Sequence, residues 1–139
     1  MKILIFHLLL VGLMATDRGS IFSINYIGKS ADEIKELVLE HHKMYKPNTA
    51  FINDSYNYLK YEDRIREITV LFFLNDNNHC RMIRIMSDYS NINDLRDELD
   101  SNYESVDNYN WKYKAGNMCY SVSLTEEDWY FTIAIKKKE

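Results

Sequence analysis

The chain has 139 residues, of which 46% are hydrophobic and 27% charged, and its formal net charge is −4 at pH 7. This length suits one compact domain, and the composition excludes an intrinsically disordered chain. The acidic balance argues against nucleic acid and anionic lipid as partners, because no basic stripe opposes it and the lysines at positions 136–138 form only a short tail.

Residues 1–15 have the features of a secretory signal peptide. Lys2 supplies a short positive start, an almost unbroken apolar run follows, and polar residues come directly after it. The run is shorter than the ~20 residues that cross a bilayer, so no stable membrane anchor is predicted. The alternative is a buried N-terminal strand or helix. We expect a signal peptide within residues 1–23, cleaved between residues 15 and 24, and a periplasmic or secreted product that comprises residues 24–139.

The first half of the mature chain predicts one helix and three strands. Ser30 and Glu33 have the spacing of a capping box, and Pro47 stops the helix. The helix carries one apolar stripe, made of Ile34, Leu37, Val38, His41 and Tyr45. Strands are predicted at residues 56–61, 68–74 and 81–86, with an Asn-rich turn at residues 75–78.

The second half repeats this plan. A helix is predicted over residues 90–103, capped by Asn91 or Asn93, with Ile92, Leu95, Leu99 and Tyr103 on its apolar stripe. Strands follow at residues 110–114, 118–124 and 129–136, and the last two alternate apolar with polar side chains. In the last strand the alternation predicts that Trp129, Phe131, Ile133 and Ile135 are buried beneath Leu37, Val38, Leu95 and Leu99.

The predicted order is therefore α-β-β-β-α-β-β-β. Because each helix has one apolar stripe, both should lie on the same face of one antiparallel sheet, which gives a two-layer α+β sandwich. The halves also share a short pattern, Leu59-Lys60-Tyr61 in one and Trp111-Lys112-Tyr113 in the other. A duplicated αβββ unit would explain this likeness, and the general resemblance between antiparallel meanders is the alternative.

Residue patterns that carry chemistry are poorly represented. His41 and His42 are adjacent, so on a helix they point about 100° apart and cannot clamp one metal ion. His41, on the apolar stripe, is expected to be a hydrogen-bonded core histidine. The chain has no zinc-binding spacing, no nucleophile elbow and no glycine-rich phosphate loop. The sequence therefore predicts no catalytic residue, no metal site and no cofactor.

The two cysteines leave two alternatives open. Export would permit a disulfide between Cys80 and Cys119. Such a bridge needs Cα atoms within about 7 Å of each other. Cys119 falls on the polar face of its strand, however, and Cys80 stands at a strand start whose facing is ambiguous. Two free, half-buried thiols are the other interpretation.

Four segments carry a resemblance to known proteins. They are Gly28-Lys29-Ser30-x-x-Glu33-Ile34, Leu71-Phe72-Phe73-Leu74, Leu95-x-x-x-Leu99-x-x-x-Tyr103 and Glu127-x-Trp129-Tyr130-Phe131. With these segments the chain resembles small exported bacterial proteins that lack an assigned activity. The resemblance covers most of the mature chain. It implies export and a single α+β domain, and it brings no catalytic residue with it.

Two functions remain as hypotheses. The first is a non-enzymatic binding module, in the periplasm or outside the cell, whose partner is a protein or a small ligand. Its surface would be the sheet face opposite the helices, with Tyr130, Thr132, Ser121 and Ser123 as the expected partner surface. The second is a small hydrolase whose catalytic groups meet only in the folded chain.

Overall fold

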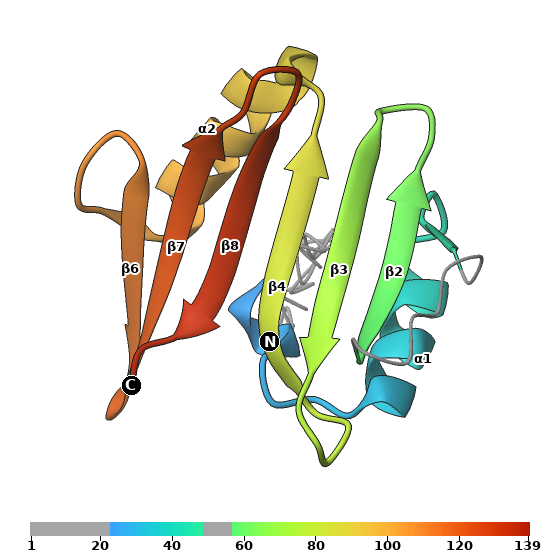
Figure 1. Ribbon diagram of the computed structural model, residues 1–139. Coiled ribbons are helices and arrows are strands. Elements are labelled where there is room, and N and C mark those ends of the chain that lie inside the picture. The colour runs from blue at the N-terminus through green and yellow to red at the C-terminus, as the bar shows by residue number, and fades with distance from the viewer. Residues whose placement is uncertain (1–22, 49–56) are drawn as a thin grey trace, which may run out of the picture.

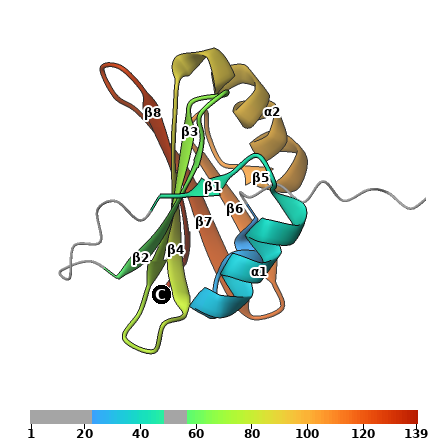
Figure 2. The ribbon, with the colours of Figure 1, turned by 90° about the vertical axis from the view of Figure 1, so that its right-hand side faces the viewer.

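A computed structural model describes residues 23–48 and 57–139, which form one eight-stranded antiparallel sheet with both helices on the same side of it (Figure 1, Figure 2). The predicted α+β class and two-layer arrangement are confirmed. The helices are α1 (Ala31–His41) and α2 (Ile92–Asn102), preceded by the short 3-10 turns η1 (Ile24–Tyr26) and η2 (Tyr89–Asn91). The strands are β1 (Lys46–Pro47), β2 (Tyr58–Asp63), β3 (Ile68–Leu74), β4 (Cys80–Ser87), β5 (Glu104–Ser105), β6 (Asn110–Ala115), β7 (Met118–Glu126) and β8 (Phe131–Lys137).

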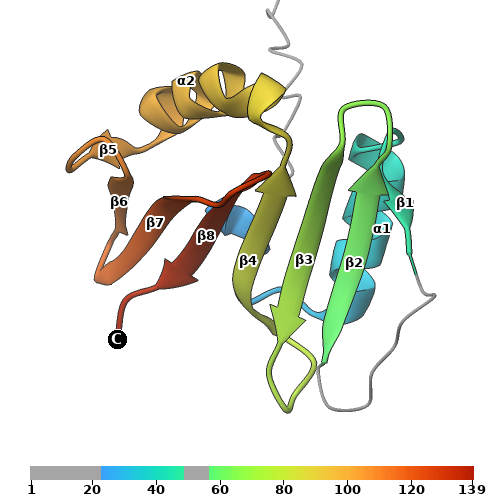
Figure 3. The same ribbon diagram turned by 45° about the horizontal axis from the view of Figure 1, so that its top comes forward.

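The sheet order is palindromic. It runs β1-β2-β3-β4-β8-β7-β6-β5, so the last strands of the two halves pair at the centre and the two-residue strands β1 and β5, which the sequence did not predict, lie at the edges (Figure 3). Each half is a helix followed by four strands, which is one strand more than the αβββ unit expected from the sequence. In each helix the buried positions are the fourth and eighth residues after the N-cap, Ile34 and Val38 after Ser30 and Leu95 and Leu99 after Asn91.

The start of α1 is as predicted and its end is not. The Ser30 hydroxyl accepts a hydrogen bond from the Glu33 amide at 3.2 Å, and the Glu33 carboxylate accepts one from the Ser30 amide at 2.8 Å. The prediction that His41 is a core histidine is wrong, because its side chain is half-exposed. The helix ends at His41, and His42 leaves helical geometry with φ −129° and ψ 58°. That departure turns the His42 ring, instead of the His41 ring, toward the core.

The core lies between the sheet and the helices. Inward-facing residues of β3, β4, β7 and β8 alternate with outward-facing ones, and the largest fully buried side chains include Phe72, Phe131, Ile83, Ile85, Ile133 and Ile135. The predicted burial of Phe131, Ile133 and Ile135 is confirmed, whereas that of Trp129 is wrong, since its side chain is 86% exposed. The reason is the hairpin that joins β7 to β8. The Glu127 amide bonds the Tyr130 carbonyl at 2.9 Å, which closes the turn and leaves Trp129 beyond the end of the sheet.

The segment before α1 belongs to the folded domain. Tyr26 is buried, and Ile24 and Ile27 pack against the core. The Ile24 amide donates a hydrogen bond to the Tyr103 hydroxyl at 3.3 Å, which ties the start of the described chain to the residue that follows α2. The segment therefore joins the two halves on the helix side of the sheet.

The contrast between Phe131 and Trp129 gives a matched test of the core. Replacing Phe131 with alanine removes a fully buried ring and should lower the free energy of unfolding by about 3–5 kcal/mol. The same truncation at exposed Trp129 should change it by less than about 0.5 kcal/mol. Urea denaturation of both variants measures the difference. Equal stabilities for Phe131→Ala and Trp129→Ala would contradict the facing of β8.

Candidate binding face

The second face of the sheet carries no covering layer among the described residues (Figure 2). We call it the open face and define it by the outward side chains of β2, β3, β4, β8, β7 and β6. Strand pairing aligns these side chains in rows that cross the sheet. The central row is Lys60, Leu71, Arg84, Ala134, Ser123 and Asn110, and a neighbouring row is Tyr58, Phe73, Met82, Lys136, Ser121 and Lys112.

The open face contains three of the four residues of the predicted partner surface, and Tyr130 adjoins it at the start of β8. Ser121, Ser123 and Thr132 are half-buried, and Ser121 and Ser123 belong to the two rows above. Thr132 pairs with Met86 on one side and Thr125 on the other. Tyr130 precedes β8 and its side chain is 38% exposed. Ser121, Ser123 and Thr132 occupy the β7–β8 half of the face.

The β2–β4 half of the face holds residues that the sequence reasoning missed. The Phe73 ring lies against two guanidinium groups, with its centroid 5.8 Å from Cζ of Arg81 and 5.7 Å from Cζ of Arg84. The Tyr58 ring is a third neighbour, at 5.9 Å between centroids. In a regular strand, positions 81 and 84 point to opposite faces. A register shift lets them meet, since Phe73 pairs with Met82 while Leu74 pairs with Cys80.

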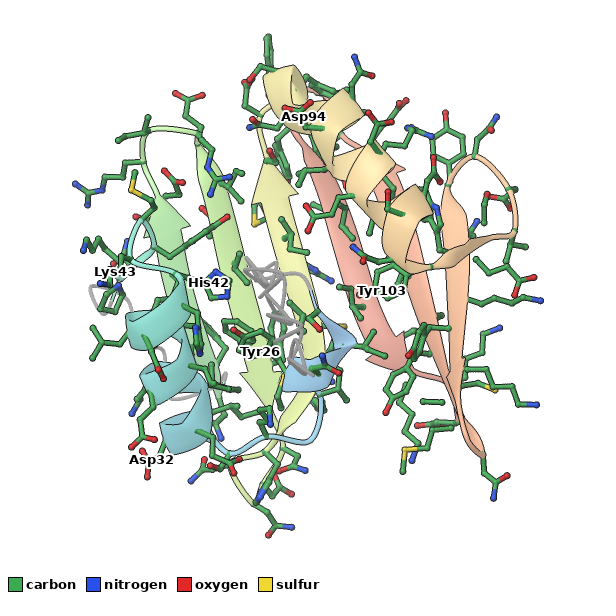
Figure 4. The ribbon with its side chains drawn as sticks, turned by 180° about the vertical axis from the view of Figure 1, so that it is seen from behind. Tyr26, Asp32, His42, Lys43, Asp94 and Tyr103 are labelled. Atoms are coloured by element: carbon green, nitrogen blue, oxygen red, sulfur yellow. The ribbon has the colours of Figure 1, made fainter. Side chains whose placement is uncertain are left out.

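Charge is divided between the two layers. The helices are acidic, with Asp32, Glu33, Glu36 and Glu40 against Lys35 in α1, and Asp94, Asp97, Glu98 and Asp100 against Arg96 in α2. Figure 4 shows Asp32 and Asp94 on the outer side of this layer. At the outward positions of the six strands, the charged side chains are Lys60, Arg84, Lys112, Lys114 and Lys136 against Glu62, and the register shift in β4 adds Arg81. The net charge of −4 conceals this separation, and the basic surface absent from the linear sequence is formed by the fold.

Both cysteines are free thiols on opposite faces of the sheet. Cys80 is buried on the helix side, and burial raises the pKa of its thiol to about 11. Cys119 is exposed and pairs with Lys114 on the open face. Because β8 lies between β4 and β7, the two backbones are two strand spacings apart, about 9–10 Å, which is beyond the reach of a disulfide.

On the helix side, His42 and Tyr26 form a hydrogen-bonded pair. The His42 Nε2 and the Tyr26 hydroxyl are 3.0 Å apart, next to α1 (Figure 4). Burial and then the charge of Tyr61 raise the pKa of Tyr26 to about 12. Burial, followed by the positive charges of His41 and Arg66, lowers the pKa of His42. Both shifts keep the pair neutral at pH 7, so the phenol is not activated as a nucleophile.

A second polar cluster anchors the turn between β2 and β3. Asp63 is buried, and its carboxylate accepts hydrogen bonds from the amides of Ile65 and Arg66 at 3.0 and 3.1 Å. The Arg66 Nε donates to the same carboxylate at 2.6 Å. Burial alone would raise the pKa of Asp63, but these bonds outweigh it and lower the pKa. The Arg66 guanidinium also lies over the Tyr45 ring, 5.6 Å from its centroid. The acceptors of Asp63 are thus engaged in holding the turn.

Other kinds of site find little support in the part of the chain that the structure describes. Within residues 23–48 and 57–139, no three His, Cys, Asp or Glu side chains gather where they could hold a metal ion. None of the helices there combines the length and apolar character that crossing a bilayer requires. Comparison with protein-family models, curated proteins and solved structures finds no match to this chain. Function has therefore to be inferred from the residues themselves.

The neutral His42 predicts a pH dependence of stability. In the unfolded chain His42 takes up a proton near its ordinary pKa of 6.5, and in the folded chain it does so only at lower pH. Between those two values the unfolded state binds more protons, so acidification favours unfolding. We expect the free energy of unfolding to fall as the pH decreases through 6.5, and to fall less in His42→Gln.

The comparison variant for this prediction is His41→Gln, because the His41 side chain is half-exposed and acts on His42 only through its charge, which is second to burial as a cause of the lowered pKa. It should retain most of the decline between pH 7 and pH 5, and more of it than His42→Gln. Chemical denaturation at closely spaced pH values measures both slopes. A decline in His42→Gln as steep as in the parent protein would show that another group causes it.

Proposed function

We propose that this chain is an exported binding protein that holds its partner against the open face of the sheet. The observation that carries the proposal is the composition of this face. It presents arginine and half-buried aromatic and aliphatic side chains on a surface that no other described element covers. Arginine and aromatic residues are the side chains most enriched at protein interfaces and at their energetic centres.

The breadth of the open face supports a macromolecular partner over a small ligand. Its side chains come from six neighbouring strands, and the rows of paired residues extend from β2 to β6. Stable protein interfaces involve roughly 20–30 residues on each side, which suits a surface of this kind. Small molecules are usually held instead in concave sites with a few convergent polar groups.

The state of the buried nucleophiles also supports binding over hydrolysis. A hydrolytic nucleophile needs a lowered pKa or an adjacent base that takes its proton. Burial instead raises the pKa of Tyr26 and of Cys80. The one histidine beside Tyr26 has a lowered pKa, and a less basic imidazole is a poorer acceptor of that proton.

Tyr130 tests the proposed surface. Its side chain is 38% exposed, so Tyr130→Ala should leave the melting temperature nearly unchanged and should weaken association measured by pull-down or sedimentation. Tyr109 is a matched control, because it is 44% exposed and its ring lies against Arg96 of α2, on the helix side. Association that survives Tyr130→Ala would remove this part of the face from the proposal, and a large loss of stability would make Tyr130 a core residue.

Export is tested by the mature N-terminus. The proposal predicts that the protein made in its own host begins after residue 15 and no later than Ile24. Cleavage beyond that point would remove the Ile24 amide that bonds Tyr103 and would approach buried Tyr26. N-terminal sequencing of the periplasmic or secreted fraction measures the position. Recovery of intact Met1 in the cytoplasmic fraction would contradict export.

A further inference from the structure

The cations of the open face differ in their internal partners. Lys60 is paired with Glu62 at 3.0 Å, and Lys112 with Glu104 at 3.4 Å. Among the ion pairs of the described residues, none engages Arg81, Arg84, Lys114 or Lys136. The face therefore holds four positive groups whose charge no described carboxylate neutralises.

Arg81 and Arg84 are also held in place. Both guanidinium groups lie within 5.8 Å of the centroid of the Phe73 ring, the range of cation–π attraction. A guanidinium fixed in this way loses less side-chain entropy when it binds, and its planar fork matches a carboxylate in a bidentate geometry. The two guanidinium groups are therefore preorganised to bind anions. Apolar side chains lie beside them, because Leu71 pairs with Arg84 and Met82 pairs with Phe73.

From this arrangement we propose that the open face binds an acidic protein surface, one that presents Asp or Glu carboxylates next to apolar side chains. This inference rests on the proposed function and adds the chemistry of the partner. The carboxylates would meet Arg81, Arg84 and Lys136. The apolar groups would cover Leu71, Met82 and Ala134, which lie among these cations in the two rows of paired residues.

Three other occupants fit the surface less well. A second copy docked face to face would place these cations against each other. If the open face of one copy instead bound the helix layer of another, each contact would leave both kinds of surface free elsewhere, and the copies would form an open array instead of a closed dimer. Single-stranded nucleic acid binds sheet faces by stacking bases on aromatic rings. On this face the Phe73 ring already lies against the guanidinium groups of Arg81 and Arg84, which compete with a base for stacking on it. Anionic lipid headgroups would meet Arg81, Arg84 and Lys136 but would leave Leu71, Met82 and Ala134 without apolar side chains to cover them.

The test uses protein purified from cells that express the complete chain and two labelled peptides. One peptide contains glutamates with a tryptophan at every fourth position, and the other has glutamine in place of each glutamate. Fluorescence anisotropy at 50 mM salt should show that the glutamate peptide binds about tenfold more tightly or better, with a preference that declines at 300 mM salt. Amide chemical-shift changes should map to Leu71, Ala134 and Ser123.

Arg84→Glu should weaken binding of the glutamate peptide by about tenfold or more, because like charges then meet. Lys35→Glu makes the same change of charge in α1 and should leave the affinity unaltered. The double variant Arg81→Gln and Arg84→Gln removes the cations without adding a carboxylate. It should lose the preference for glutamate and retain the melting temperature, which separates loss of recognition from loss of folding.

Each other result has a distinct meaning. If the glutamate peptide does not bind, or if both peptides bind equally, the inference of an acidic partner is wrong. The proposal that the open face binds a partner would then be decided by the Tyr130→Ala experiment. Tighter, Arg84-dependent binding of single-stranded DNA or of phosphatidylglycerol vesicles would replace the acidic protein with that class of ligand. Sedimentation that shows Arg84-dependent self-association would make a second copy the occupant. An association that neither Tyr130→Ala nor Arg84→Glu affects would reject the open face as a binding surface.

Discussion

The antiparallel pairing of β4 with β8 is the constraint on which the rest of the structure depends. It is the only contact between strands of the two halves in the sheet order of the described residues, and it aligns Ile83 with Ile135 and Ile85 with Ile133. Side chains alternate strictly between the faces of a strand, so a shift of one residue in this pair would turn the inward side chains of β8 to the open face. The four isoleucines, all essentially fully buried, oppose such a shift because it would expose them to water.

The same register determines where the charge lies. With Ile83 and Ile85 directed inward, Arg84 points outward, and with Ile133 and Ile135 inward, Lys136 does so as well. The two helices carry eight acidic side chains and two basic ones, Lys35 and Arg96, and their polar sides face solvent. Two layers of opposite charge are therefore a consequence of packing one apolar face of the sheet against two amphipathic helices. A linear count of charges cannot detect this separation, because it averages over both layers.

Much of the fold follows from local sequence patterns, and its exceptions have physical causes. Period-two alternation is enough to place Phe131, Ile133 and Ile135 in the core, and the Ser30 capping box marks the start of α1. Trp129 continues the same alternation but lies in the hairpin, since a pattern of side chains does not reveal where backbone pairing stops. The Arg81 position depends on a register shift in the neighbouring strand, which is a tertiary property. The strand order and the short edge strands are tertiary properties as well. The basic face depends on them, so local sequence patterns could not predict it.

The edges of the sheet restrict how a partner can bind. An exposed edge strand offers unpaired amides and carbonyls to which another chain can add a strand. Here the outermost strands of the described chain, β1 and β5, have two residues each, and they bring Lys46, Pro47 and Glu104 to the edges. Charged residues, proline and short length all disfavour strand addition, and proline lacks the amide that a ladder requires. Strand addition is therefore disfavoured at these two strands, and the binding that we propose would rely on side chains of the open face. Its specificity then depends on the spacing of guanidinium and apolar groups that the β4–β8 register sets, so a substitution that disturbs this central pairing should impair stability and recognition together.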